Sequence, residues 1–149
     1  MSLKSTIEAE IKQSMLNKDK DRLRALRAIK SQILLAETEK GGSSELSEEV
    51  EMKLLTKAAK QRRDSITVFE EQGRQDLAAT EKSELEVIES FLPKQLSEAE
   101  IEAEVKNVIE EVGASGPQDM GKVMGASTKK LAGKADGKLI SAIAKKLLN

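Results

Sequence analysis

The sequence predicts an all-α protein in which an N-terminal four-helix unit is followed by a three-helix domain. Apolar residues recur at helical spacing along nearly the whole chain of 149 residues. Alternating runs rich in β-branched or aromatic side chains, which are typical of strands, are missing. At "LPKQLSEAE", residues 92–100, a proline ends one helix and a Ser–Glu pair can start another. We therefore expect two domains, residues 1–93 and 94–149.

The first two helices are expected over about residues 3–16 and from near Asp19 to the glycine pair at 41–42. Ser5 and Glu8 have the spacing of a capping box for the first helix. The spacing of the apolar residues predicts the positions that face inward: Ile7, Ile11, Met15, Leu23, Leu26, Ile29 or Lys30, and Ile33.

The third helix is expected to begin near Ser47 and to end at Gly73, because glycine is the usual residue after a helix. The fourth is expected to begin at Asp76 and to end near Pro93, since the residue before proline avoids the helical conformation. The predicted inward positions are Val50, Leu54, Ala58, Ile66, Phe69, Leu77, Leu85, Ile88 and Phe91.

Three further helices are expected after the proline. A capping box at residues 97–100 starts the fifth, and Gly113 ends it. Pro117 suits the first position of a sixth helix, Gly133 its end, and Asp136 the cap of a seventh. The predicted inward positions are Ile101, Val105, Val108, Val112, Ile140, Ile143, Ala144 and Leu147.

The composition excludes several classes of chemistry. The chain has no cysteine and no histidine, so it has no disulfide, no thiolate nucleophile and neither of the commonest zinc ligands. The first residues are charged and lack the apolar core of a secretory signal, and no apolar run approaches the roughly 18 residues of a membrane span. We expect a soluble cytoplasmic protein without metal or cofactor.

One dense polar cluster, "KQRRDSI" at residues 60–66, lies in the middle of the third helix. Its Arg62, Arg63, Asp64 and Ser65 could in principle form a site. The simpler interpretation is a helix face held by salt bridges within the helix or between domains.

Two glycine–lysine pairs occur close together, in "GKVMG" at 121–125 and "GKADG" at 133–137. A phosphate-binding P-loop requires a preceding strand and a Ser or Thr after the Gly-Lys pair. Val123 and Ala135 stand there instead, and no strand is predicted, so a nucleotide site is excluded. The second segment is interpreted as the boundary between two helices.

Gly121 and Gly125 lie inside the predicted sixth helix, where each costs roughly 1 kcal/mol relative to alanine. Because they are four residues apart, they share one face and would open a shallow groove. Two explanations stand at this point. The groove accommodates a neighbouring helix, or it allows the backbone of a partner such as RNA to approach closely.

The last third of the chain is basic. Residues 117–149 carry seven lysines and two acids, a net charge of +5, against six glutamates and one lysine in residues 98–111. Such a surface suits phosphate groups, and the lack of Tyr and Trp favours recognition by shape rather than by base stacking. Two other basic stripes, Lys20–Arg24–Arg27 and Lys53–Lys57–Lys60, are interleaved with acids and are weaker candidates.

Three segments together resemble the YqeY family: "AAKQRRDSITVFEEQGRQDLA", "EVIESFLPKQLSEAEI" and "DMGKVMG…GKADGKLISAIAKKLL". The resemblance covers essentially the whole chain and extends to the tail domain of GatB, a subunit of the glutamine-dependent aspartyl/glutamyl-tRNA amidotransferase. That tail contacts tRNA, while catalysis occurs elsewhere. Asp136–Gly137 departs from the usual Asn-Pro of the tail. The residues that match the tail's pattern are Gly121, Lys122, Val123, Met124, Gly133, Lys134 and Ala135.

The resemblance implies a non-catalytic tRNA-binding or adaptor module related to the amidotransferase. The family-level activity would be that of a carbon–nitrogen ligase with glutamine as amido-N-donor. This chain lacks the kinase-like portion of GatB and any amidase, so it would at most assist such an enzyme. The expected partners are tRNA and an amidotransferase or aminoacyl-tRNA synthetase complex. The alternative is a protein-interaction or assembly factor that binds no RNA. The expected tRNA-binding residues are Gly121, Lys122, Gly125, Lys129, Lys130 and Lys134.

Overall fold

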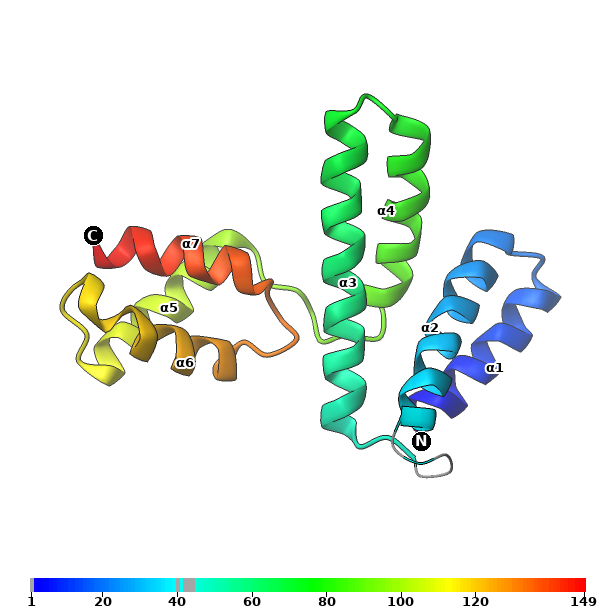
Figure 1. Cartoon of the computed structure of the whole chain (residues 1–149), viewed down its shortest axis with the longest axis horizontal. Helices are drawn as coiled ribbons and strands as arrows, with labels where there is room; N and C mark the ends of the chain where they lie inside the picture. Colours follow the sequence, from blue (N-terminus) through cyan, green and yellow to red (C-terminus); the bar gives the residue numbers. More distant parts are fainter. Residues whose placement is uncertain (1, 40, 42–44) are drawn as a thin grey trace. The chain divides into compact units, whose positions relative to one another are not determined.

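The computed structural model describes residues 2–39, 41 and 45–149, and over these residues it contains helices and no strand (Figure 1). The all-α prediction is confirmed. A short 3₁₀ turn, η1 (Pro117–Asp119), precedes the sixth α-helix. The α-helices of the described residues are α1 (Leu3–Leu16), α2 (Lys20–Glu39), α3 (Glu48–Glu71), α4 (Gln75–Glu89), α5 (Glu98–Val112), α6 (Met120–Lys130) and α7 (Gly137–Leu148).

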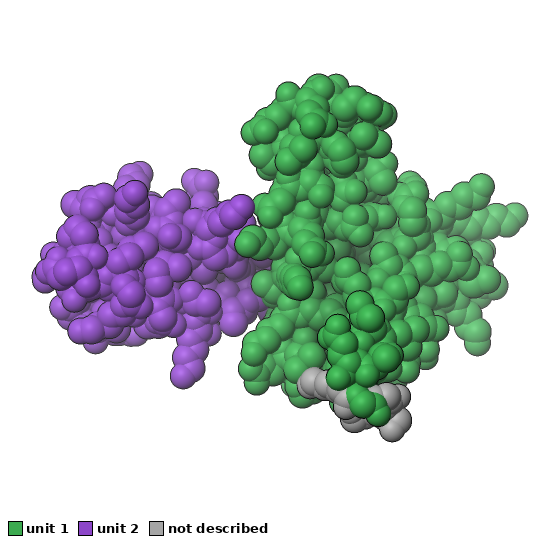
Figure 2. Space-filling view, in the orientation of Figure 1, with its two compact units in different colours: residues 1–92 green, residues 93–149 purple. Residues whose placement is uncertain are grey.

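The internal contacts of the chain divide it into two compact units, residues 1–92 and 93–149 (Figure 2). Unit 1 holds α1 to α4, and unit 2 holds η1 and α5 to α7. Each unit has its own cluster of buried apolar side chains. Whether residues 94–149 fold independently of the rest stays a prediction.

In unit 1, α3 and α4 form the closest helix pair, and α4 also packs against α2, which in turn carries α1 (Figure 1). The contact between α2 and α3 is slight by comparison. The core is made of small and aliphatic side chains from all four helices and the segment before α3: Ile7, Ala25, Leu26, Ile29, Ile33, Leu46, Leu55, Ala58, Ala59, Val87 and Ile88.

The start of α1 differs from the prediction. Ser2 is the N-cap, with an extended backbone and a side chain that accepts the amide of Ser5 at 3.2 Å. Ser5 is already helical and therefore cannot cap, and Glu8 pairs instead with Lys30 of α2 at 3.3 Å. The predicted Ser5–Glu8 capping box is wrong.

The predicted inward position of Met15 is also wrong, because its side chain is 56% exposed. Helix α1 packs mainly on α2, and in its last turn Ser14 takes the buried position. Helix α2 ends at Glu39, before Gly41, which adopts a positive φ of 97°. Gly42, the second glycine of the predicted stop, lies outside the described residues.

The helix ends of unit 1 near α4 follow the sequence more closely. Gly73 adopts a φ of +70° in the turn after α3, as expected for a glycine that stops a helix. Helix α4 begins one residue before the predicted Asp76, and its N-cap, Arg74, makes no capping hydrogen bond through its side chain.

In unit 2 the predicted caps are confirmed. Ser97 and Glu100 make both hydrogen bonds of a capping box, and Gly113 ends α5 in the left-handed conformation. Asp136 caps α7 by accepting the amide of Lys138 at 3.3 Å. Pro117, however, starts η1 rather than α6.

The end of α6 comes earlier than predicted, at Lys130 rather than at Gly133. Leu131 is buried in the core of unit 2, and Gly133, with a φ of +75°, turns the chain toward α7. The loop is held from the other side, because Leu96 donates its amide to the Lys134 carbonyl at 2.9 Å and Gln95 Nε2 donates to the Gly133 carbonyl at 2.7 Å.

A first prediction concerns the independence of unit 2. A fragment of residues 94–149 contains a complete core from α5, α6 and α7 and retains the contacts of Gln95 and Leu96. We expect a helical circular dichroism spectrum and a cooperative thermal transition. In the same fragment Ser97→Ala should lower the free energy of unfolding by about 1 kcal/mol, since it removes the cap. A fragment without a cooperative transition would contradict this boundary.

Candidate nucleic-acid interface

Core packing fixes which face of α6 is exposed. Val123 and Ser127 are fully buried, and Leu131 follows them into the core formed with α5 and α7. At about 100° per residue, the opposite face holds positions 121, 122, 125 and 129, within an arc of about 100°. All four are exposed: Gly121, Lys122, Gly125 and Lys129. We call these residues the α6 face.

The two glycines of the α6 face meet no neighbour in unit 2. A Cβ atom added at Gly121 or Gly125 would have no heavy atom within 4 Å, apart from the backbone of its own helix and its chain neighbours. Neither has a positive φ, so the backbone conformation does not require glycine. The packing explanation therefore has no partner helix in unit 2. What the glycines provide is an accessible helix backbone, at a cost of about 1 kcal/mol each.

The lysines near this face are not equivalent. Lys122 and Lys129 are exposed and make no ion pair with any residue that the structure describes. The ammonium of Lys130 lies 3.2 Å from Glu104 and 3.7 Å from Glu111, both on α5. The hydrogen bond to Glu104, with the charges of both carboxylates, raises the pKa of Lys130. Of the predicted binding residues, Lys130 is thus the one already engaged.

Lys134, the last predicted binding residue, lies beyond α6 in the loop to α7. Its side chain is exposed, while its backbone is fixed by hydrogen bonds to Leu96 and to the Leu131 carbonyl, each 2.9 Å long. The backbone hydrogen bonds fix where the side chain starts, while its ammonium group lies at the end of a flexible stem. The structure therefore places Lys134 outside the α6 face.

The charge of unit 2 is polarised between helices. Helix α5 carries an acidic surface from which Glu104 and Glu111 reach Lys130. Helices α6 and α7 both end in lysines, Lys129 and Lys130 in one and Lys145 and Lys146 in the other, where a positive charge also suits the helix dipole. A polyanion would be attracted to α6 and α7 and repelled by α5.

The arginine cluster of α3 has a structural role that the sequence did not specify. Arg62 Nη1 lies 2.9 Å from Glu81 and 2.7 Å from Glu84 of α4, and Glu84 also accepts from Arg24 of α2 at 3.1 Å. Arg63 pairs with Glu89 of α4 at 3.4 Å. The prediction placed these salt bridges within one helix or between the two domains. In the structure they join different helices of unit 1.

Over residues 2–39, 41 and 45–149, no helix is long and apolar enough to cross a membrane. In the same part of the chain no group of three or more acidic side chains could hold a metal ion.

The structure thus defines a small all-helical protein with two compact units. One face of α6 combines exposed glycines with lysines that make no ion pair with any described residue. The chain belongs to the YqeY family: the family model described as "Yqey-like protein" matches residues 4–148. The family resemblance noted in the sequence is confirmed.

Two curated relatives are similar to this chain, both named "Altered inheritance of mitochondria protein 41, mitochondrial". The protein of Lachancea thermotolerans is 35% identical over 115 residues, which cover 76% of this chain and 61% of the relative. That of Clavispora lusitaniae is 30% identical over 116 residues, which cover 76% of this chain and 66% of the relative. The matched segment is thus less than two thirds of either relative.

The relatives correct one expectation. A cytoplasmic location was predicted from the absence of a secretory signal and of a membrane span, and the names of both relatives place them in mitochondria. The cytoplasmic prediction is wrong. Its reasoning failed because the absence of those two features does not distinguish between compartments.

A second prediction follows from the open space around the glycines. Replacing both Gly121 and Gly125 with alanine should raise the free energy of unfolding by about 1–2 kcal/mol, because alanine favours the helix and its Cβ atoms clash with nothing. Gly113→Ala is the matched control and should destabilise, since Gly113 has a φ of +66°. Urea denaturation of the full chain measures both. A less stable double variant would show that the glycines pack against something after all.

A third prediction concerns Glu84, which is 6% exposed between Arg24 and Arg62. Glu84→Ala should lower the free energy of unfolding by about 1–3 kcal/mol, because both guanidinium groups lose a buried acceptor but stay partly hydrated. Glu89→Ala, which removes a longer and more exposed pair, should cost less than about 1 kcal/mol. Equal effects in chemical denaturation would contradict a special role for the buried carboxylate.

Proposed function

We propose that the chain is a non-catalytic tRNA-binding or adaptor module that contacts the phosphate backbone of tRNA through the α6 face and Lys134. The α6 face is the observation that carries the proposal. It combines unpaired cations with exposed backbone on one side of a helix whose other side is fixed by the core.

The unpaired lysines supply the attraction. A phosphate that contacts Lys122, Lys129 or Lys134 releases counterions without first breaking an ion pair among the described residues. Lys130 differs, because a phosphate there must compete with Glu104 and Glu111.

The glycines supply access. Without side chains at two positions one turn apart, a phosphate backbone can come closer to α6 than to a helix covered with side chains. Within unit 2 no other use of the two glycines is visible, although both lower the stability of the helix. Residues that lower helix stability without a packing reason are expected mainly at functional sites.

The remaining chemistry favours binding over catalysis. The chain lacks histidine and cysteine, and the polar cluster of α3 is occupied by ion pairs with α4. The link to tRNA and to a glutamine-dependent carbon–nitrogen ligase comes from the resemblance to the GatB tail. In that reading this chain positions RNA or a partner for an enzyme that carries out the amide transfer.

A second candidate function is a protein-interaction or assembly factor that binds no RNA. It is favoured by a different observation, an apolar groove in unit 1 between α2 and α3.

The fourth prediction tests tRNA binding by its salt dependence. In filter-binding titrations of the full chain with bulk tRNA, the double variant Lys122→Glu/Lys134→Glu should lose most of the affinity. Lys53→Glu/Lys57→Glu changes the net charge equally in unit 1 and should have little effect. The slope of log K against log salt should fall by roughly one for each contacting lysine removed.

A finer comparison uses two adjacent lysines. Lys129→Gln should reduce the salt slope more than Lys130→Gln, because only Lys130 is paired with α5. The proposal fails if the wild-type chain retains no tRNA even at low salt. It also fails if both double variants weaken binding equally, since affinity would then reflect net charge alone.

A further inference from the structure

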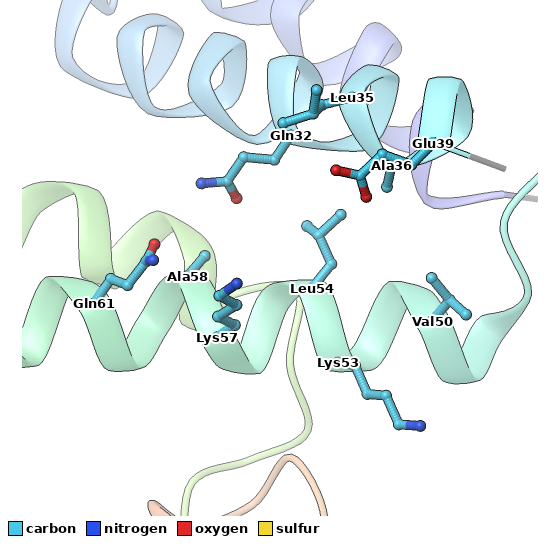
Figure 3. Close-up of a pocket in the computed structure, with 10 residues that line it drawn as sticks. All are labelled: Gln32, Leu35, Ala36, Glu39, Val50, Lys53, Leu54, Lys57, Ala58 and Gln61. Atoms are coloured by element: carbon cyan, nitrogen blue, oxygen red, sulfur yellow. The ribbon is translucent and has the colours of Figure 1, made fainter. Parts of the chain in front are cut away.

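Unit 1 contains an open groove between α2 and α3 that its core does not fill. Its volume is about 420 Å³. It arises because α4 packs against both α2 and α3, while these two touch each other only slightly. Figure 3 shows Gln32 of α2 and Leu54 of α3 pointing into the space between the two helices. We call this space the α2–α3 groove.

The groove is lined by one face of each helix. The α2 positions have the spacing i, i+3, i+4 and i+7, and the α3 positions continue such a pattern over about 17 Å of helix. Each helix therefore presents a second, partly apolar face in addition to the one in the core. The lining residues are Gln32, Leu35, Ala36 and Glu39 of α2 and Val50, Lys53, Leu54, Lys57, Ala58 and Gln61 of α3.

The centre of the groove is apolar and partly exposed. Leu35 is 62% exposed. Leu54 and Val50 reach the core only at their edges and are half-buried. Apolar side chains between two helices, open along their length, match the grooves that receive an amphipathic helix from another protein.

The charges at the rim determine which helix fits. On the α3 side stand Lys53, held by an exposed pair with Glu49 at 2.9 Å, and Lys57, which makes no ion pair with any described residue. The α2 side carries Glu39 and the uncharged Gln32. Figure 3 shows the side chain of Lys53 pointing away from α2, so a helix seated in the groove would place one edge along Lys57, where a carboxylate complements the charge.

We propose that the α2–α3 groove is a docking site for an amphipathic helix of a partner protein, with an apolar face and acidic residues along the edge that lies against α3. This site lies in unit 1 and uses none of the residues assigned to tRNA, so it goes beyond the proposed RNA contact. The two together would make the chain an adaptor that holds RNA with one unit and a protein helix with the other.

The experiment uses two designed helical peptides of about 14 residues, long enough to span the groove. Both have the same leucine face; one carries glutamates along one edge and the other lysines at the same positions. Fluorescence anisotropy of each labelled peptide is measured against the full chain. We expect saturable binding of the glutamate peptide and binding of the lysine peptide at least about tenfold weaker.

Variants locate the binding. Leu35→Glu should weaken the affinity of the full chain for the glutamate peptide at least about tenfold. Leu16→Glu, at a side chain 72% exposed elsewhere in unit 1, should have no effect. Lys57→Glu should reverse the preference and favour the lysine peptide, while Lys20→Glu should not. Both leucines are exposed, so the variants should fold, and circular dichroism checks this. Neither Leu35→Glu nor Lys57→Glu should change tRNA binding.

Three outcomes would overturn the proposal: no binding of the glutamate peptide, binding that Leu35→Glu leaves unchanged, or equal binding of both peptides. A fourth outcome would also overturn it: light scattering shows that the wild-type chain is a dimer and that Leu35→Glu is a monomer. A second copy of the chain would then be the occupant of the groove. Since tRNA binding is measured on the same variants, a failure of peptide binding at the α2–α3 groove can be distinguished from a failure of tRNA binding at the α6 face.

Discussion

The burial of Val123 and Leu131 against α5 and α7 is the constraint on which the functional side of unit 2 depends. A helix with one apolar stripe has only one orientation that covers it, so this burial turns Gly121, Lys122, Gly125 and Lys129 outward together. It also sets Lys130 beside the acids of α5. Unit 1 shows the opposite situation, because α3 has more apolar surface than its neighbours cover, and the α2–α3 groove is the result.

Much of the fold was predictable because each helix carries its own signal. The capping box at 97–100, the cap at Asp136 and the stop at Gly113 rest on interactions within a few residues, and all three are confirmed. Some errors are local, since Ser2 rather than Ser5 caps α1 and Pro117 starts η1 rather than α6. Others occur where tertiary contacts decide. Met15 has the right spacing but no helix over it. Helix α6 ends at Lys130, because the backbone leaves the helical conformation at Leu131.

The candidate site was predictable in composition but not in detail. The spacing of Gly121 and Gly125 correctly indicated a shared face. Which lysines are unpaired could not be read from the sequence, since Lys129 and Lys130 are adjacent and differ only in their distance from the carboxylates of α5. The groove was missed because Leu35 lies outside the predicted inward face of the second helix, and only the packing of α4 against both α2 and α3 shows the space beside it.

Binding of tRNA to the α6 face can be followed through the amide chemical shifts of the full chain during titration with tRNA. Glycine amides are well separated in such spectra, which makes Gly121 and Gly125 natural reporters. If the α6 face binds tRNA, the amides of these glycines, Lys122 and Lys129 should shift progressively, with little change at Leu54 in the groove. Shifts confined to unit 1, or no shifts at low salt, would contradict it.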